Sequence, residues 1–345
     1  MSGPEGWIAA AADWSDDRFA ALQDLVFQGV VSPILYDLGF AHRLEEAYTA
    51  TGAALAAAVG LVALRLLLIP LERLWPVEAR GPARAVAADV AYTLIHRLGF
   101  FGLLVFALTD PAEIALQRAA LAFGFDGGTL TDAVPWLRET PAAALAVCLV
   151  ATDFTLYWIH RAQHASAVWW SLHALHHSQR HMTMWTDDRQ HLLDSLVIAL
   201  VLIAVGTIVG TPPASYAWVG VLTGLVEGLS HANLRLDFGP VGGRLLVSPR
   251  YHRTHHALVE PGPGPGPGPR LPRYSNFATL FPVWDWLFGT ADFRRDDYRP
   301  TGIVNDPFGD GLIRQQIAGL RQLARALARK IGGARKASAM TLPNA

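Results

Sequence analysis

Long apolar stretches separated by short polar segments dominate the pattern of this chain. Five of them are each close to the roughly 20 residues that a helix needs to cross the hydrocarbon core of a bilayer. They lie at about 51–71, 87–108, 141–159, 192–210 and 214–230. The pattern predicts an all-α integral membrane helical bundle with four to five membrane-crossing helices.

The two ends of the chain have different patterns. A shorter apolar piece near 25–40 contains Pro33 and Asp37, so we expect an interfacial or re-entrant element there rather than a full span. Between Leu312 and Ile331, apolar residues alternate with arginines at helical spacing. This is typical of a cationic helix lying on an anionic leaflet, although a solvated face packed on the protein fits nearly as well.

These patterns divide the chain into three parts. Residues 1–50 are expected to form an N-terminal interfacial segment, 51–300 the membrane domain, and 301–345 a C-terminal basic amphipathic helix and tail. A Gly-Pro repeat at 261–269 reads as an extended linker inside the membrane domain, because it can form neither a helix nor a strand ladder.

The charges in the loops predict an orientation. Arg73, Arg80 and Arg84 follow the first stretch, whereas the segment 109–140 is mainly acidic. Short loops rich in Lys and Arg stay in the cytoplasm. The first loop is therefore expected inside and the second outside, which places every histidine-rich stretch at the cytoplasmic face.

The composition supports a membrane protein and excludes one class of partner. Hydrophobic residues make up 52% of the chain and charged residues only 17%, with a mean hydropathy of +0.26. This composition is too apolar for an ordinary soluble enzyme of this length. A net charge of -1 supplies no basic field, so we expect no nucleic-acid partner.

Histidines are concentrated in one part of the chain. All but His42 and His96 of the 13 lie between residues 160 and 256. On a helix, positions i, i+3 and i+4 share one face, so three groups would direct two, three and three imidazoles toward a common point. The groups are His160 with His164, His173 with His176 and His177, and His252 with His255 and His256.

A metal centre explains this concentration better than packing does. Eight imidazoles packed without a metal would leave buried nitrogens unsatisfied, or repelling one another when protonated. One tetrahedral ion uses at most four protein ligands, so eight nitrogens indicate a dinuclear site. Imidazole suits iron, copper and zinc alike, and its softness does not choose among them.

The histidine groups also carry a resemblance to a known family. The runs YWIHRAQH (157–164), WWSLHALHHS (169–178), SPRYHRTHH (248–256) and NFATLFPVWDWLFGT (276–290) resemble the fatty acid hydroxylase and sterol desaturase superfamily over about 72–295. Membership implies a membrane-embedded di-iron oxygenase with a cytosolic active site, capped by the histidine-bearing helices. It assigns catalytic and metal-ligand roles to His160, His164, His173, His176, His177, His252, His255 and His256.

The chain departs from that family at two places. One is the Gly-Pro repeat after the third box, and the other is DDRQHLLD (187–194), where relatives usually have a proline after the histidine. The local loop geometry at both places is therefore not fixed by the resemblance.

Further site residues are expected from their positions near the spans. His231, at the cytoplasmic end of the fifth stretch, is a candidate ninth ligand, and a satisfied helix-end histidine is the alternative. His191, which opens the fourth stretch on the same side, is a further candidate. Asp153, Asp194 and Glu227 are carboxylates near apolar spans, where charges are costly without partners. We expect them to orient ligand imidazoles by accepting an N–H, although Glu227 is also able to bind metal directly.

The resemblance and the site together predict a lipid hydroxylase or desaturase. It would use two irons, which zinc is able to replace in purified protein, and O2 as co-substrate. Its electrons would come from a separate cytochrome, ferredoxin or reductase, because the sequence has no Rossmann fingerprint, cysteine cluster or fused cytochrome domain.

Two other classes stay open. One is a membrane metal-binding protein or metal transporter, although transporters usually place their ligands near the midplane between broken helices. The other is a zinc-dependent membrane hydrolase, which is disfavoured because the residues between His160 and His164 are Arg, Ala and Gln instead of a HExxH motif.

Overall fold

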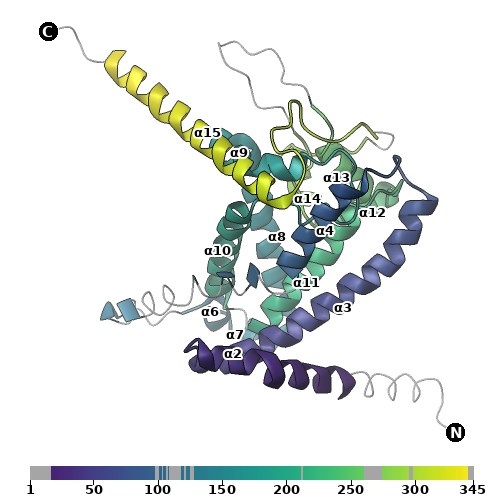
Figure 1. The fold of residues 1–345 in the computed structure, drawn as a ribbon. Coiled ribbons are helices and arrows are strands. Elements are labelled where there is room, and N and C mark those ends of the chain that lie inside the picture. The colour runs from purple at the N-terminus through teal and green to yellow at the C-terminus, as the bar shows by residue number, and fades with distance from the viewer. Residues whose placement is uncertain are drawn as a thin grey trace.

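The structure, a computed structural model, describes residues 17–340 except 98–100, 103, 106–107, 109–117, 120–121, 125–127, 211–212, 260–273 and 295–297. The regular elements within this part of the chain are helices (Figure 1), apart from an isolated β-bridge between Ala257 and Thr301. The expected all-α architecture is confirmed. The Gly-Pro repeat at 261–269 lies outside the described residues.

Four helical segments are long and apolar enough to cross a membrane: Asp17–Asp37, Ala41–Leu74, Pro141–Ala165 and Leu192–Val209. The last three contain the apolar stretches expected at 51–71, 141–159 and 192–210. They correspond to η2 and α3 (Ala41–Arg43 and Leu44–Leu74), α8 (Pro141–Ala165) and α10 (Leu192–Val209). The protein is therefore a multi-pass membrane protein.

The other two predicted spans are only partly matched. Helix α4 (Ala83–Arg97) covers the first part of the stretch at 87–108, and several residues after it lie outside the described part of the chain. Helix α11 (Pro213–Ser230) packs along α3, and its residues Trp218–Ser230 form an apolar helix, while the side chains of 213–217 lie outside the described part of the chain.

The N-terminal segment differs from the expectation that Pro33 and Asp37 interrupt it. Residues 17–37 form one continuous helix that includes a π turn, η1 (Phe27–Val31), followed by α2 (Ser32–Asp37). Pro33 lies in the first turn of α2, next to the π turn, where a missing N–H is tolerated. Figure 1 shows this helix running crosswise beneath the lower ends of the bundle helices. Its interfacial location stays a prediction.

A helical cap covers the other end of the bundle. It consists of α9 (Ala167–His177), α12 (Gly239–Leu245), α13 (Pro249–His255) and α14 (Val283–Leu287), together with α15 (Leu312–Met340), which packs along α9 (Figure 1). Two short helices, α6 (Leu130–Ala133) and α7 (Pro135–Glu139), lie at the opposite end.

Local sequence explains where the two histidine-bearing cap helices begin. The Ser166 hydroxyl accepts the Trp169 N–H at the start of α9, and the Ser248 hydroxyl accepts the Tyr251 N–H at the start of α13. Serine is a favoured N-cap because it satisfies one of the free amides of the first turn, and Pro249 suits the first helical position of α13. Both helices start close to their histidines, so the caps fix the direction of the imidazoles.

Candidate metal centre

The structure brings nine histidines together in two neighbouring groups. Within each group, one ring nitrogen from each histidine lies within 4.8 Å of those from the other members. The first group contains His160, His164, His173, His177 and His255, and the second contains His176, His231, His252 and His256. All three boxes and His231 therefore meet inside the cap, from residues that are far apart in the sequence.

Helix geometry distributes the histidines between the two groups. The end of α8 supplies His160 and His164, one turn apart, to the first group. Helix α9, and α13 with its C-cap residue His256, each divide three histidines between the two groups, because neighbouring helical positions point in different directions. The two groups are thus held by the same two helices, which sets them side by side.

The inner nitrogens of the second group are all Nε2 atoms. The Nε2 atom of His231 lies 2.9 Å from Nε2 of His252 and 3.2 Å from Nε2 of His176. The Nε2 atoms of His252 and His256 are 3.1 Å apart. A neutral imidazole has one N–H and one lone pair, so four such atoms around one point form a natural set of ligands for a cation.

The outer nitrogens are held by main-chain carbonyls. The Nδ1 atom of His160 donates to Phe277 O at 2.8 Å, that of His255 to Ser275 O at 2.7 Å, and that of His231 to Glu227 O at 2.7 Å. A hydrogen bond of this kind fixes the tautomer, so the Nε2 lone pair faces inward, as it does in metal-ligating histidines. Sequence reasoning missed the 275–277 segment, because every residue carries a carbonyl and no residue type marks this role.

Several inner nitrogens have no partner among the described residues. They include Nε2 of His160, both ring nitrogens of His164 and Nε2 of His173. A buried polar atom without a hydrogen bond costs about 1–3 kcal/mol. A bound metal ion would use these lone pairs, so the residues present fit a metal centre.

Burial also keeps the cap imidazoles in the form that binds metal. It lowers the pKa of His255 to about 3 and the pKa of His231 to about 4. For His176, His177, His252 and His256, burial first and neighbouring imidazoles second lower the pKa well below its ordinary value. These imidazoles are neutral near pH 7, and metal binding requires the neutral form.

Asp194 lies beside the first group. Its carboxylate is 3.5 Å from Nδ1 of His173, and it accepts hydrogen bonds from Gln163 Nε2 at 3.0 Å and Trp169 Nε1 at 2.6 Å. The Asp194 carboxylate thus lies beside the imidazole of His173 on α9 rather than beside the nearby His191, and its role in orienting a ligand stays a prediction.

The other two carboxylates act differently from what their sequence positions indicated. The Asp153 carboxylate accepts the backbone N–H groups of Leu280 and Phe281 and the indole N–H of Trp284, so it anchors the chain that follows the Phe277 carbonyl. Glu227 holds His231 through its main-chain carbonyl and not through its carboxylate.

The structure places His191 outside both groups, which corrects its expected role as a ligand. His191 caps α10, with its Nδ1 atom accepting the Leu193 N–H at 3.2 Å. Its Nε2 atom lies 2.9 Å from the carbonyl oxygen of Gln316 on α15. One ring nitrogen therefore caps α10, and the other joins α10 to the C-terminal helix.

A cavity of about 350 Å³ reaches the histidines from within the bundle. Its apolar wall comes from α8, α10 and α11, with residues such as Leu156, Ile198 and Val219. His160, His173, His176, His231 and His252 line its other end. The cavity thus connects apolar surface at the level of the spans with the candidate metal ligands.

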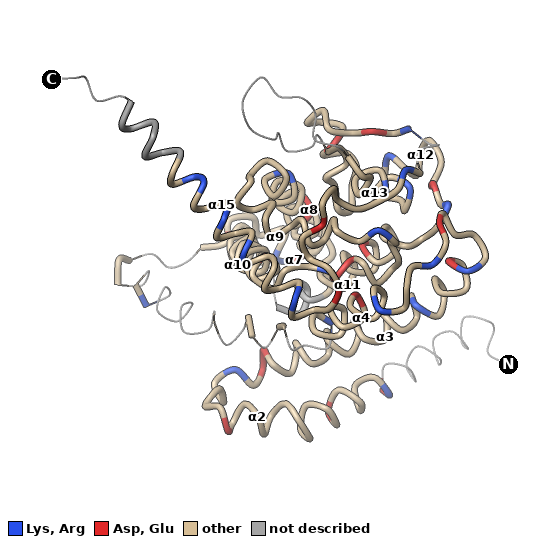
Figure 2. The backbone as a smooth tube through the Cα atoms, turned by 45° about the horizontal axis from the view of Figure 1, so that its top comes forward, with Lys and Arg blue, Asp and Glu red and all other residues tan. Residues whose placement is uncertain are grey.

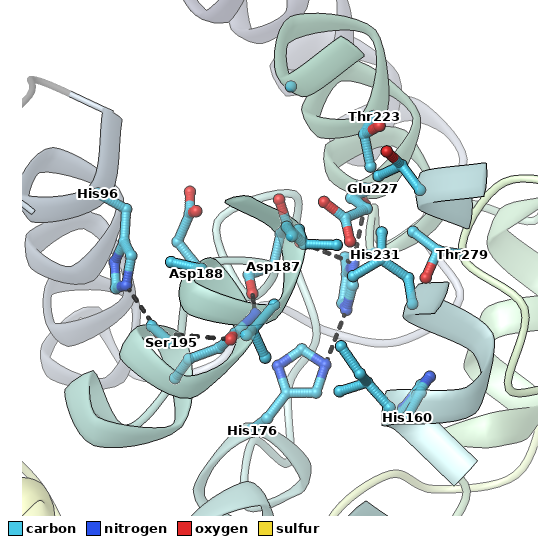
Figure 3. Close-up of a pocket in the computed structure, with 18 of the residues that line it drawn as sticks. His96, His160, His176, Asp187, Asp188, Ser195, Thr223, Glu227, His231 and Thr279 are labelled. Atoms are coloured by element: carbon cyan, nitrogen blue, oxygen red, sulfur yellow. Dashed lines mark hydrogen bonds and ion pairs between the residues drawn. The ribbon is translucent and has the colours of Figure 1, made fainter. Parts of the chain in front are cut away.

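Charged side chains lie where the cavity meets the histidines (Figure 3), and sequence reasoning did not single out most of them. Arg97 donates to Asp187 at 2.8 Å and to Asp188 at 3.0 Å, and Asp187 Oδ1 is 3.8 Å from Nδ1 of His231. Burial, followed by the charge of Asp188, raises the pKa of Asp187. The carboxylate of Glu227 lines the same region. Asp-Asp pairs also occur at 16–17 and 296–297, so the pair at 187–188 did not stand out in the sequence.

Comparisons with known proteins agree with this site. Residues 145–290 match the family model described as fatty acid hydroxylase. The chain is 27% identical over 282 residues to ornithine lipid hydroxylase OlsE of Rhizobium tropici, covering 80% of this chain and 77% of that protein.

Two further relatives are matched over shorter regions. An alkylglycerol monooxygenase of Caenorhabditis elegans is 28% identical over 162 residues, 46% of this chain and 29% of the relative. A very-long-chain aldehyde decarbonylase of Oryza sativa subsp. japonica is 26% identical over 159 residues, 46% of this chain and 53% of the relative. Both matches span little more than half of the relative at most. No solved structure matches this chain.

Proposed function

We propose that this chain, whose residues 145–290 match the fatty acid hydroxylase family model, is a membrane-bound di-iron oxygenase that hydroxylates a lipid. The observation that carries this proposal is the set of nine buried imidazoles in adjacent groups of five and four. Two sets of converging nitrogens suit two ions better than one. Their position at the end of an apolar cavity suits a lipid substrate.

Each group would hold one iron ion. His160, His164, His173, His177 and His255 would ligate the first ion, and His176, His231, His252 and His256 the second. Zinc is expected to replace iron in protein purified after overproduction, since these sites take metals by affinity as well as by function. The bound irons would supply the activation of O2 needed to attack a C–H bond.

The residues of this chain would position the substrate and keep water away. Leu156, Ile198 and Val219 would hold the acyl part of the lipid at the level of the spans. The carbonyls of Ser275 and Phe277 would keep His255 and His160 directed at the ions. The carbon to be oxidised would then lie at the inner end of the cavity, next to His176 and His231.

We also propose that the substrate carries a cationic amine near that carbon. The charged end of the cavity has the carboxylates of Asp187, Asp188 and Glu227. Two guanidiniums act on the aspartates, Arg97 by direct ion pairs and Arg65 from nearby, which leaves three carboxylates for two cations. This excess of carboxylates would favour an ammonium group. The similarity to a protein named as an ornithine lipid hydroxylase, over most of both chains, supports the same class of substrate.

The orientation, partners and domain limits are further parts of the proposal. Arg73, Arg80 and Arg84 favour a cytoplasmic location for the histidine cap. A separate cytochrome, ferredoxin or reductase would supply the electrons. Residues 51–300 would form the catalytic membrane domain between the N-terminal helix and the C-terminal helix.

Two features argue against the alternative classes. A metal transporter would place its ligands near the membrane midplane, whereas these histidines lie at the cap end of α8 and α11. A zinc hydrolase of the HExxH type would need a glutamate between His160 and His164, and this chain has none there.

Incubation of iron-loaded membranes with reductant, an electron donor and ¹⁸O2 tests the proposal. Hydroxylation predicts one ¹⁸O atom in an amine-bearing lipid, detected by mass spectrometry, with His176→Ala inactive and the exposed His42→Ala active. Loss of two hydrogens without label would show desaturation instead. Product formed without O2 consumption would favour a hydrolase, and metal flux into proteoliposomes without lipid oxidation would favour a transporter.

A further inference from the structure

Helix α15 has one face that packs on the protein. Gln315 is 1% exposed and Gly319 is buried, and both lie on the side of the helix that contacts the cap. A Cβ added at Gly319 would lie 2.3 Å from Cδ2 of His191, so the glycine permits the close approach of the two segments. This face accounts for how α15 is attached.

The opposite face of α15 is apolar and exposed. Its large side chains are between 41% and 74% exposed, and they are spaced three, four or seven residues apart. At 100° per residue they fall within a sector of about 80°. We call this the apolar stripe, and it consists of Ile313, Ile317, Leu320, Leu327 and Ile331.

A row of exposed arginines borders the apolar stripe on one side. Arg314, Arg321, Arg325 and Arg329 follow it by roughly 80–160° around the helix, and Figure 2 shows the basic positions spaced along α15. The sequence from 312 to 331 contains no Asp or Glu. An apolar sector flanked by cations on an exposed helix is characteristic of a helix that lies in a membrane interface.

The attachment of α15 sets its level relative to the bilayer. Gln316 Oε1 accepts the Leu192 N–H at 2.9 Å, and the Gln316 carbonyl lies 2.9 Å from Nε2 of His191. Leu192 is the first residue of α10, one of the candidate spans. The first turns of α15 are therefore fixed at the point where the chain enters the membrane.

From that point α15 extends beyond the other cap helices (Figure 1). We propose that α15 is an interfacial helix that binds an anionic lipid surface. The apolar stripe would enter the boundary between headgroups and acyl chains, and the arginines would contact lipid phosphates. A symmetric contact with a second copy through the stripe is less favourable, because it would bring two arginine rows close to each other. This proposal does not depend on the reaction catalysed.

Site-directed spin labelling of the full-length protein in vesicles tests this location. In a Cys148→Ala background, nitroxides at Leu320 and Leu327 report on the stripe, and one at Lys330, exposed but outside the stripe, is the control. Vesicles of phosphatidylcholine are compared with vesicles that also contain phosphatidylglycerol. We expect the stripe labels to be more accessible to O2 than to a water-soluble nickel complex, more strongly with phosphatidylglycerol, and the control label to show the reverse.

Charge variants separate this model from its rivals. Combining Arg321→Gln, Arg325→Gln and Arg329→Gln should remove the effect of phosphatidylglycerol, while the metal content stays unchanged as a check on folding. Stripe labels that are fully accessible to the nickel complex in both vesicles would overturn the proposal. So would spin–spin broadening that disappears on dilution with unlabelled protein, because it would identify a second copy as the occupant of the stripe.

Discussion

The Nε2 atoms of His231 and His252 lie 2.9 Å apart, although the first residue follows α11 and the second belongs to α13. The other ring nitrogen of His231, Nδ1, donates to the Glu227 carbonyl and so leaves Nε2 facing His252. The pair therefore joins a residue outside the three histidine boxes to the second group of candidate ligands.

Replacement of His231 tests this relationship. We expect His231→Ala to lower activity by at least about tenfold and to reduce metal content, as loss of a ligand or its support commonly does. Activity and bound metal are measured on the same preparation. His42→Ala, which removes an exposed histidine in η2, is the control and should change neither. A fully metallated and fully active His231→Ala protein would show that the boxes suffice without it.

Metal stoichiometry is a second expectation. Protein produced with ample iron should contain two metal ions per chain, because one ion is unable to use the nitrogens of both groups. Elemental analysis checks this, and zinc in place of iron would be compatible with it. One ion per chain, with all three boxes intact, would contradict a dinuclear site.

The metal-free protein should lose stability in mild acid. Burial lowers the pKa of His255 to about 3 and that of His231 to about 4, from 6.5. Protonation then favours the unfolded chain, so the stability contributed by each neutral histidine is complete above pH 6.5 and decreases as pH falls toward its folded pKa. The slope is about 1.4 kcal/mol per pH unit for each histidine. Thermal denaturation in detergent from pH 7.5 to 4.5 measures it, and a flat profile would contradict the neutral burial of these rings.

Asp153 should matter for stability as well as activity. Asp153→Ala would leave the N–H groups of Leu280, Phe281 and Trp284 without their acceptor, which costs at least about 1 kcal/mol. It would also loosen the chain beyond the Phe277 carbonyl that supports His160. We expect a lower melting temperature in detergent together with reduced metal retention. Asp37→Ala, at an exposed helix end, is the matched control, and equal behaviour of the two variants would remove this role.

Topology can be tested in intact cells with single cysteines in a Cys148→Ala background. Cysteine at Arg80 should be protected from a membrane-impermeant reagent and cysteine at Asp126 should react, because arginines follow the first span and acidic residues dominate 109–140. The reverse labelling pattern would place the histidine cap on the outer side.

The sequence predicted the parts of the site that depend on helical spacing. The i, i+3 and i+4 positions of His173, His176 and His177 determine their direction once α9 forms, and the structure places all three at the candidate centre. The ligand role expected for His191 does not match its position in the structure. The start of a span gives the depth of a residue in the membrane but not the direction of its ring, and the ring of His191 is directed toward the carbonyl of Gln316, 125 residues later in the chain. The expectation that Asp153 orients a ligand imidazole differs from the structure for a related reason. The hydrogen-bond partners of Asp153 are not neighbours on α8 but lie 127–131 residues away in the chain.

Support of the imidazoles by main-chain carbonyls has a consequence for how this protein can change over evolutionary time. A carbonyl is present whatever the side chain, so substitution at Ser275 keeps the acceptor of His255, and substitution at Glu227 keeps the acceptor of His231. Mutations at these two positions are therefore free to retune the substrate cavity or the cap surface while the direction of the two rings is inherited unchanged.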